Sequence, residues 1–217
     1  MAKAPAHTIL LMRHPQTPAN TEHFFSGRLD IDITPAGEKM RDRAVAAGIT
    51  FAPDRVWTSP LRRCHAVADP IADALGLASE PNQNLIEMDF GVLEGTAFDA
   101  GWVSDHGFPW PVDEQGISHP MEGGESFEST YARANALFEE LRPLAGRTLC
   151  ITHGGMIRSI LGALYGAPKD RFWYLRVDNV ASAILSCDGD RFTLDALGLT
   201  PEEVIARYAT NDEERGR

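Results

Sequence analysis

Two apolar runs of this chain end in arginine or histidine side chains. The run 9–12 is followed by Arg13 and His14, and the run 148–151 is followed one residue later by His153. Parallel strands end at one edge of a sheet, so we expect these three side chains to lie close together. Arginine offers a planar fork of donors to an oxyanion, and a neutral imidazole can attack phosphorus. Either histidine alone would be typical of a hydrogen-bonded strand end, but the pair favours phosphoryl chemistry.

The sequence around these residues alternates predicted strands and helices. Short apolar runs predict buried strands at residues 8–12, 55–59 and 147–152. Apolar residues at helical spacing predict helices over residues 35–47, 60–75, 125–141 and 156–165. A turn at Asp188-Gly189 predicts a hairpin between strands 180–186 and 191–196. This order predicts an α/β fold, a single-domain three-layer sandwich whose mostly parallel sheet carries helices on both faces.

Glycine, proline and irregular stretches mark the expected boundaries. Gly48 and Gly76 are expected to end their helices, and Pro70 to kink or split the second one. The segment from about 95 to 124 lacks clear periodicity, which is typical of a lid or insertion. A disordered tail is expected from about residue 208.

Composition limits the partners that the protein can bind. Thirty-one acidic and twenty basic residues give a formal charge of −11, so nucleic acid and anionic membranes are not expected partners. No apolar stretch approaches the roughly 20 residues of a membrane span, and the first is too short for a secretory signal. We therefore expect one cytoplasmic domain over residues 1–217, with a homo-oligomer left open. The three cysteines lack CxxC spacing and are expected to be buried thiols.

The segment LMRHPQTPAN resembles the signature of the histidine phosphatase superfamily, the phosphoglycerate mutase-like fold. That signature is usually Arg-His-Gly, a polar residue, Ser or Thr, and then Asn. Further segments resemble the family's other motifs and follow in the family's order: FSGRLDIDITPAG, TSPLRRCHAVA, LIEMDFGVLEG, GGESFESTYAR and ITHGGMIRSIL. Several ordered motifs over most of the chain are far more specific than one short pattern.

This resemblance implies roles for individual residues. His14 would be the nucleophile that becomes phosphohistidine, and Glu87 would be the general acid. The phosphoryl oxygens would be surrounded by Arg13, Arg62 and His153. The substrate would be lined by Asn20, Ser26, Gly27 and Gly154. Such a set supplies the positioning and fixed positive charge that phosphoryl transfer needs, and it implies no metal and no other cofactor.

The assignment of Glu87 has competitors. Glu87 could instead form an ion pair with Arg62 or Arg13, and Asp89 and Glu94 are neighbouring carboxylates. Protonating a leaving group requires a carboxyl group with raised proton affinity, which the apolar neighbours of Glu87 could provide by desolvation. Its place in the motif favours Glu87 over the other two.

The assignment of Arg62 also has an alternative, because Arg63 follows it directly. Arg62 lies in the first turn of the helix predicted to open at Pro60, where free amides attract anions. Position therefore favours Arg62, although it could be a solvated helix residue. Arg28 and Gln16 fall in segments expected to form the pocket and are less favoured.

The predicted activity is that of a phosphomonoesterase, which hydrolyses a small phosphorylated metabolite through phosphohistidine at His14. A phosphoglycerate-type mutase would use the same residues, but the segment after Gly95 does not resemble the basic, Tyr-containing loop of mutases. A catalytically inactive binding protein is favoured only by Pro15, which replaces the family's usual glycine and removes a backbone donor. Costly polar groups gathered in one crevice oppose that third hypothesis.

Overall fold

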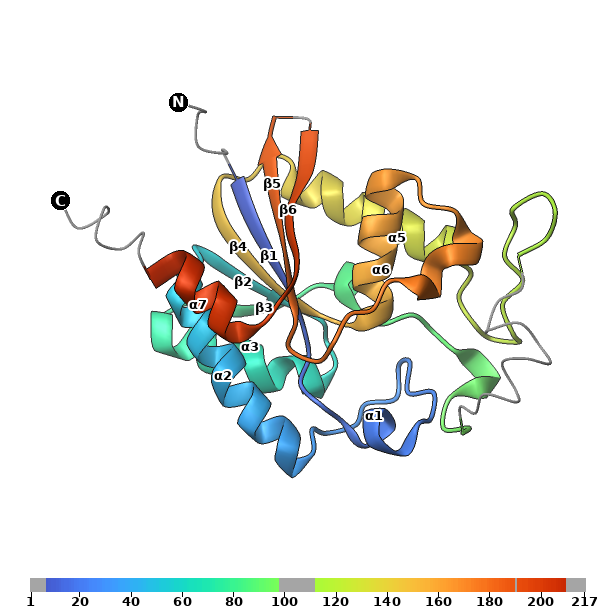
Figure 1. Cartoon of the computed structure of the whole chain (residues 1–217), viewed down its shortest axis with the longest axis horizontal. Coiled ribbons are helices and arrows are strands. Elements are labelled where there is room, and N and C mark those ends of the chain that lie inside the picture. Colours follow the sequence, from blue (N-terminus) through green and yellow to red (C-terminus); the bar gives the residue numbers. More distant parts are fainter. Residues whose placement is uncertain (1–6, 98–111, 190, 210–217) are drawn as a thin grey trace.

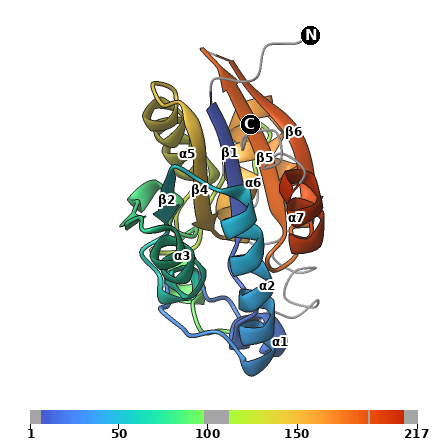
Figure 2. The same cartoon turned by 90° about the vertical axis from the view of Figure 1, so that its left-hand side faces the viewer.

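The computed structural model of this chain describes residues 7–97, 112–189 and 191–209. Its described residues form a six-stranded sheet in the order β3-β2-β4-β1-β5-β6, with helices on both faces (Figures 1 and 2). The strands are β1 (His7–Arg13), β2 (Arg55–Thr58), β3 (Ser79–Pro81), β4 (Gly146–Thr152), β5 (Ser182–Asp188) and β6 (Arg191–Leu199). The α-helices are α1 (Pro18–Glu22), α2 (Pro35–Phe51), α3 (Arg62–Leu75), α5 (Phe127–Leu141), α6 (Gly154–Tyr165) and α7 (Pro201–Ala209). Short 3₁₀ turns are η1 (Gln83–Leu85), η2 (Gly91–Leu93) and η3 (Lys169–Tyr174).

Strand β1 contributes side chains to both cores of the sandwich. Leu10 and Met12 pack with α2, α3 and α7, whereas Ile9 and Leu11 pack with α5 and α6. All four are fully buried, and burying each such side chain contributes roughly 1.5–3 kcal/mol. Successive strand residues point to opposite faces, so a strand covered on both faces needs a continuous apolar run. The predicted three-layer α/β sandwich is confirmed.

The sheet is parallel from β3 to β1 and antiparallel from β1 to β6. The parallel pairs β3–β2, β2–β4 and β4–β1 bring the carboxyl ends of four strands to one edge. Strand β5 runs antiparallel to β1, and β6 runs antiparallel to β5. The predicted C-terminal hairpin is therefore confirmed, and β6 continues further than predicted, to Leu199.

Helix α2 continues past Gly48, where the sequence predicted its end. A Cβ built on Gly48 would lie 2.3 Å from Ile71 Cδ1 of α3, so this glycine permits a close approach of two helices. The helix ends instead at Phe51, and Ala52, which follows it, is left-handed with a φ of 50°. At its start, Thr34 Oγ1 accepts a hydrogen bond of 2.9 Å from the Gly37 amide, as an N-cap does.

Helix α3 contains Pro70 and continues to Leu75, so the proline does not split it. The left-handed Gly76, with a φ of 66°, ends the helix as predicted. The cysteines meet the expectation of buried thiols, because Cys64, Cys150 and Cys187 are all free and buried.

Helix α7 was not predicted from the sequence. It packs on α2 through the buried side chains of Val204 and Tyr208. It includes the first two residues of the predicted tail, and residues 210–217 lie outside the described part of the chain. Residues 98–111, nearly half of the predicted lid or insertion, also lie outside it.

Candidate active site

The carboxyl ends of β1 and β4 bring the two predicted histidines together. The strands pair with Arg13 opposite Thr152, and the His14 amide donates a hydrogen bond of 2.9 Å to the Thr152 carbonyl. His14 and His153 therefore follow matching positions on neighbouring strands. Their ring centroids lie 5.1 Å apart, and both side chains are buried. This is the placement that the strand ends predicted.

The imidazole of His14 is neutral and has a defined tautomer. Its Nδ1 lies 2.6 Å from the Pro15 carbonyl oxygen, and a carbonyl can only accept, so Nδ1 carries the hydrogen. Burial, with the positive charges of Arg13 and Arg63, holds the pKa of His14 well below its usual value. Nε2 therefore keeps its lone pair at neutral pH, which is the state that a nucleophile needs.

His153 is oriented by Ser59, which follows β2, and by Arg63 of α3. Its Nε2 lies 2.6 Å from Ser59 Oγ, and its Nδ1 accepts a hydrogen bond of 3.3 Å from Arg63 Nε. A guanidinium group only donates, so the neutral ring carries its hydrogen on Nε2. Burial and the charge of Arg63 hold the pKa of His153 well below its usual value. Both histidines are therefore neutral, and their rings do not repel each other.

The arginine that reaches the histidines from α3 is Arg63. It is 1% exposed, and its Nη1 and Nη2 donate hydrogen bonds to the carbonyls of Leu29, at 2.7 Å, and Gly27, at 2.6 Å. Burial lowers the pKa of Arg63. No carboxylate of the described residues forms an ion pair with it, and its charge lowers the pKa of both His14 and His153.

Arg62 points away from the histidines, so its predicted position around the phosphoryl oxygens is wrong. Its side chain is 54% exposed, and its guanidinium group pairs with Asp30 at 3.1 Å and with Asp32 at 3.2 Å. Successive helix residues are rotated by about 100°, so Arg62 and Arg63 face different directions at the start of α3. The neighbour that was less favoured from the sequence, Arg63, takes the inner position.

Arg13 ends β1 as a largely buried cation. Its Nη1 donates a hydrogen bond of 2.6 Å to the Val177 carbonyl. Burial lowers the pKa of Arg13 to about 10, so the guanidinium group stays charged at neutral pH. Its Nε is buried and has no hydrogen-bond partner within the described residues. Buried donors are rarely left unpaired, so this nitrogen is suited to bind an oxyanion.

Glu87 lies at the N-terminus of α6. Its Oε2 accepts a hydrogen bond from the Gly155 amide and its Oε1 accepts one from the Met156 amide, both at 3.1 Å. Such amides have no partner within the helix, and a carboxylate stabilises them. Arg133 fixes the preceding residue, because its Nη1 donates a hydrogen bond of 2.8 Å to the Ile86 carbonyl. Glu87 is therefore held on two sides.

The other candidates from the sequence hold loops in place. Asp89 pairs with Arg28 at 3.2 Å, and Glu94 Oε1 accepts a hydrogen bond of 2.7 Å from the Arg28 amide. Gln16 Oε1 accepts a hydrogen bond of 2.8 Å from the Thr34 hydroxyl group. In the described part of the chain, Glu87 forms no ion pair. It is therefore not paired with Arg13 or Arg62, which was the alternative considered from the sequence.

A pocket of about 280 Å³ opens beside Arg13 and Glu87. Three of the four residues predicted to line the substrate border it, namely Asn20, Ser26 and Gly154. The fourth, Gly27, instead supplies the carbonyl that holds Arg63. The remaining lining residues are mostly apolar or small: Ala19, His23, Phe24, Phe25, Phe90, Gly155, Arg158 and Trp173.

Three residues near the site were not singled out from the sequence. Ser59 follows β2 and bonds His153, so the argument from strand ends could have identified it. Arg158 lies four residues after Gly154 on α6, and helical spacing puts both on one face. Asn179 donates hydrogen bonds of 3.1 Å to the His14 carbonyl and to Asn20 Oδ1, and no sequence pattern indicated it.

The described residues contain no group of three His, Cys, Asp or Glu side chains that could hold a metal ion. In the same part of the chain, no helix is both long and apolar enough to cross a membrane.

The fold and the site define a class of proteins in which a histidine at the end of a parallel strand lies among arginines and a second histidine. Residues 9–200 match the histidine phosphatase superfamily (branch 1), so the chain belongs to this family, as its motifs indicated. It is 26% identical over 199 residues to phosphoserine phosphatase 1 of Hydrogenobacter thermophilus, covering 88% of this chain and 92% of that protein.

Two further relatives extend the comparison. The chain is 34% identical over 170 residues to a 2,3-bisphosphoglycerate-dependent phosphoglycerate mutase of Bradyrhizobium, covering 72% of this chain and 80% of the mutase. The structure of a mycobacterial glucosyl-3-phosphoglycerate phosphatase has the same fold. Its TM-score is 0.73 at 23% identity, and the match covers 88% of this chain and 98% of that one.

Proposed function

We propose that this protein is a phosphomonoesterase that acts on a small phosphorylated metabolite through a phosphohistidine at His14. The observation that carries the proposal is the neutral imidazole of His14, whose Nδ1 is bound to the Pro15 carbonyl while Nε2 keeps its lone pair. Arg13 and Arg63 supply fixed positive charge beside it. The relative named phosphoserine phosphatase supports the same activity.

The proposed reaction has two steps. Nε2 of His14 attacks phosphorus, the bond from phosphorus to the ester oxygen breaks, and Glu87 gives its proton to the departing oxygen. Water then attacks the phosphohistidine, Glu87 takes one proton from it, and inorganic phosphate leaves while Nε2 regains its lone pair. Oε1 of Glu87 accepts two backbone hydrogen bonds, from Met88 and Met156, whereas Oε2 accepts one, from Gly155, and has a second lone pair that can hold the proton. Arg13 and Arg63 would stabilise the charge on the phosphoryl oxygens, and His153 would join them by moving its Nε2–H from Ser59 Oγ to a phosphoryl oxygen.

The role of Glu87 predicts a dependence on the leaving group. Glu87→Gln keeps one of the two oxygens that accept from the amides of α6, replaces the other by an NH₂ group, and cannot donate the proton. We expect kcat for an alkyl phosphate to fall about 10²- to 10⁴-fold, because general acid catalysis contributes that much. For p-nitrophenyl phosphate, whose leaving group needs no proton, the fall should be about tenfold or less. Equal losses for both esters would assign Glu87 a purely structural role.

A mutase is the second candidate, because the relative from Bradyrhizobium carries that name. Both activities need the same phosphohistidine and differ in whether water or a second hydroxyl group receives the phosphoryl group. We expect the wild-type protein to release more inorganic phosphate than isomer from 3-phosphoglycerate, in the presence of a metal chelator. Isomer in excess of phosphate would favour the mutase, and loss of turnover with the chelator would contradict a metal-independent reaction.

An inactive binding protein remains a third hypothesis, and phosphate release from any monoester would reject it. The cytoplasmic location, a homo-oligomeric state and the absence of nucleic-acid binding stay predictions from the sequence.

A further inference from the structure

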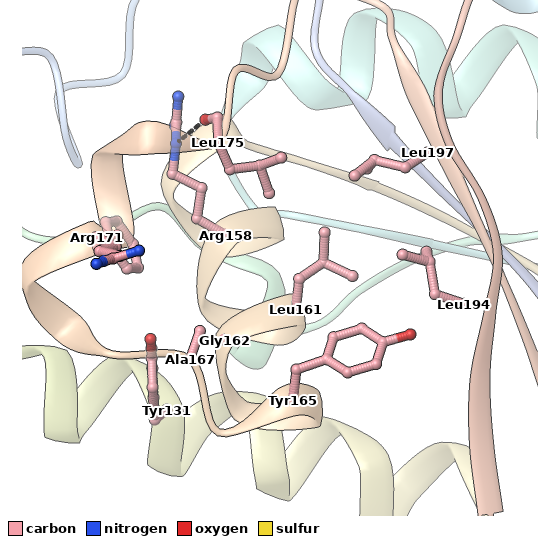
Figure 3. A pocket seen from close by; sticks show the side chains of 11 residues that line it. Tyr131, Arg158, Leu161, Gly162, Tyr165, Ala167, Arg171, Leu175, Leu194 and Leu197 are labelled. Atoms are coloured by element: carbon pink, nitrogen blue, oxygen red, sulfur yellow. Dashed lines mark hydrogen bonds between the residues drawn. The ribbon is translucent and has the colours of Figure 1, made fainter.

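A second pocket, of about 220 Å³, lies between α6, η3 and β6 (Figure 3). It shares Arg158 with the pocket beside Glu87, but Arg13, His14 and Glu87 are not among its described lining residues. Most of the residues that line it are apolar: Leu161, Tyr165, Phe172, Leu175, Leu194 and Leu197. This α6–β6 pocket therefore differs in chemistry from the candidate active site, and the proposed reaction gives it no role.

The apolar wall of the α6–β6 pocket is partly open to solvent. Tyr165 is 61% exposed and Leu197 is 39% exposed. In Figure 3 the Tyr165 ring extends from α6 towards Leu194 of β6. Single exposed apolar residues are common, but these two border one cavity together with the buried Leu161 and Phe172. Exposed apolar surface in a concave site favours a ligand with an apolar body.

The charged residues that line the α6–β6 pocket in the described part of the chain are two arginines. Arg158 is already held, because its Nε donates a hydrogen bond of 2.7 Å to the Leu175 carbonyl and its guanidinium carbon lies 5.3 Å from the centre of the Trp173 ring. The charge of Glu87 also acts on it. Arg171 is exposed and forms no ion pair or side-chain hydrogen bond with another described residue. Its guanidinium group can therefore pair with a carboxylate through two hydrogen bonds.

Tyr131 brings a hydroxyl group to the same side of the pocket. In Figure 3 its side chain points from α5 towards the segment that carries Arg171. Gly162 permits this approach, because a Cβ on this residue would overlap Tyr131 Oη. The Oη atom is buried and has no hydrogen-bond partner within the described residues, which is rare for a buried hydroxyl group. Burial and the charge of Glu128 raise the pKa of Tyr131, so the phenol remains a donor that an acceptor in the pocket would satisfy.

We propose that the α6–β6 pocket is a second ligand site, which binds a small carboxylic acid with an apolar body. The carboxylate accepts hydrogen bonds from Arg171 and Tyr131, and the apolar body packs on the leucines of α6 and β6. A carboxylate has two oxygens and one negative charge, which match these two donors and the one guanidinium group. Pockets for drug-sized ligands measure about 300–1,000 Å³, so a volume of about 220 Å³ selects a smaller acid. This inference does not depend on the proposed phosphomonoesterase function.

The test compares two probes that differ only in charge. Isotope-labelled protein is titrated with cyclohexanecarboxylate and with its neutral amide, cyclohexanecarboxamide, while NMR follows the backbone amide shifts. We expect the acid to cause saturable shifts in α6, η3 and β6, with a Kd of roughly 1 mM or lower. The amide should bind about tenfold more weakly, because charge-assisted hydrogen bonds are about twice as strong as neutral ones.

Variants assign the contacts within the pocket. Arg171→Gln should weaken binding of the acid about tenfold and bring its Kd close to that of the amide. Tyr131→Phe removes only the hydroxyl group, so it should weaken binding of the acid about 2- to 10-fold. A matched control is Arg176→Gln, because Arg176 is also an exposed arginine and pairs with Asp178 on the surface. Neither this variant nor Arg13→Gln, which alters the candidate active site, should change the Kd of the acid.

Three results would overturn this inference. The first is the absence of saturable shifts with the acid up to about 10 mM. The second is equal affinity for the acid and the amide, or an unchanged Kd in Arg171→Gln. The third is loss of binding in Arg13→Gln with shifts around β1 and β4, which would place the acid in the candidate active site. Arg171 is exposed, so its variant should fold normally, and thermal unfolding of each variant checks this.

Discussion

Alanine in place of His14 is expected to abolish hydrolysis of p-nitrophenyl phosphate, with a fall in kcat of at least about 10⁴-fold. The His14 imidazole is neutral at pH 7, lies near the charges of Arg13 and Arg63 and keeps a free lone pair on Nε2, whereas the lone pair of His153 accepts a hydrogen bond from Arg63. Without it, water would have to attack phosphorus directly. Released phosphate measured over several enzyme concentrations would reveal any residual rate.

A matched control for that variant is His65→Ala. His65 lies on the outer side of α3, where its Nδ1 pairs with Asp69 at 2.9 Å, so its loss should leave turnover near the wild-type value. Rapid acid-free quenching of the wild type with a phosphorus-labelled donor should trap acid-labile label on the protein. His14→Ala should trap none. Label or turnover that survives in His14→Ala would show that another residue is the nucleophile.

The edge of the sheet could be predicted because parallel strands end at the same edge whatever their order. A short continuous apolar run predicts a strand buried on both faces, and such strands are mostly parallel, so Arg13, His14 and His153 were expected at the same edge. The C-terminal hairpin could also be predicted, because the Asp188-Gly189 turn lies between two neighbouring strand patterns. By contrast, α7 is short and its stability comes from packing Val204 and Tyr208 on α2. Local propensity therefore could not establish it.

The end of α2 could not be predicted from the local sequence around Gly48. A glycine within a helical pattern can end the helix or admit a neighbouring helix, and the sequence around it is compatible with both. Ile71 decides between them, because its side chain fills the space where a Cβ would lie. That contact joins α2 to α3 and cannot be read from either segment alone.

The choice between two adjacent arginines failed for a reason that the sequence did contain. Arg63 lies four residues before Val67 and eight before Ile71, and both of these are fully buried on the inner face of α3. Helical spacing therefore predicts that Arg63 faces inward, whereas position in the first turn favoured Arg62. Periodicity was the better guide, because direction on a helix depends on the residue count and not on closeness to the N-terminus.

Arg62 and Arg63 are adjacent, so the same substitution at the two positions should have very different effects on kcat/KM. Arg63→Gln should lower kcat/KM for p-nitrophenyl phosphate about 10²- to 10³-fold, the usual cost of removing one donor to a transferring group. It loses the contact with His153 Nδ1 and the charge that faces the histidines. Arg62→Gln should change kcat/KM less than about threefold, because it removes only solvent-exposed pairs with Asp30 and Asp32.

Folding must be separated from chemistry in Arg63→Gln, because Arg63 also holds the carbonyls of Gly27 and Leu29. Arg63→Lys keeps the charge and should recover part of kcat, whereas a purely structural role would leave both variants equally impaired. Inhibition by inorganic phosphate gives an independent reading, since the inhibition constant should rise in Arg63→Gln and stay unchanged in Arg62→Gln. A larger loss in Arg62→Gln than in Arg63→Gln would return the phosphoryl-binding role to the exposed arginine and contradict the geometry of α3.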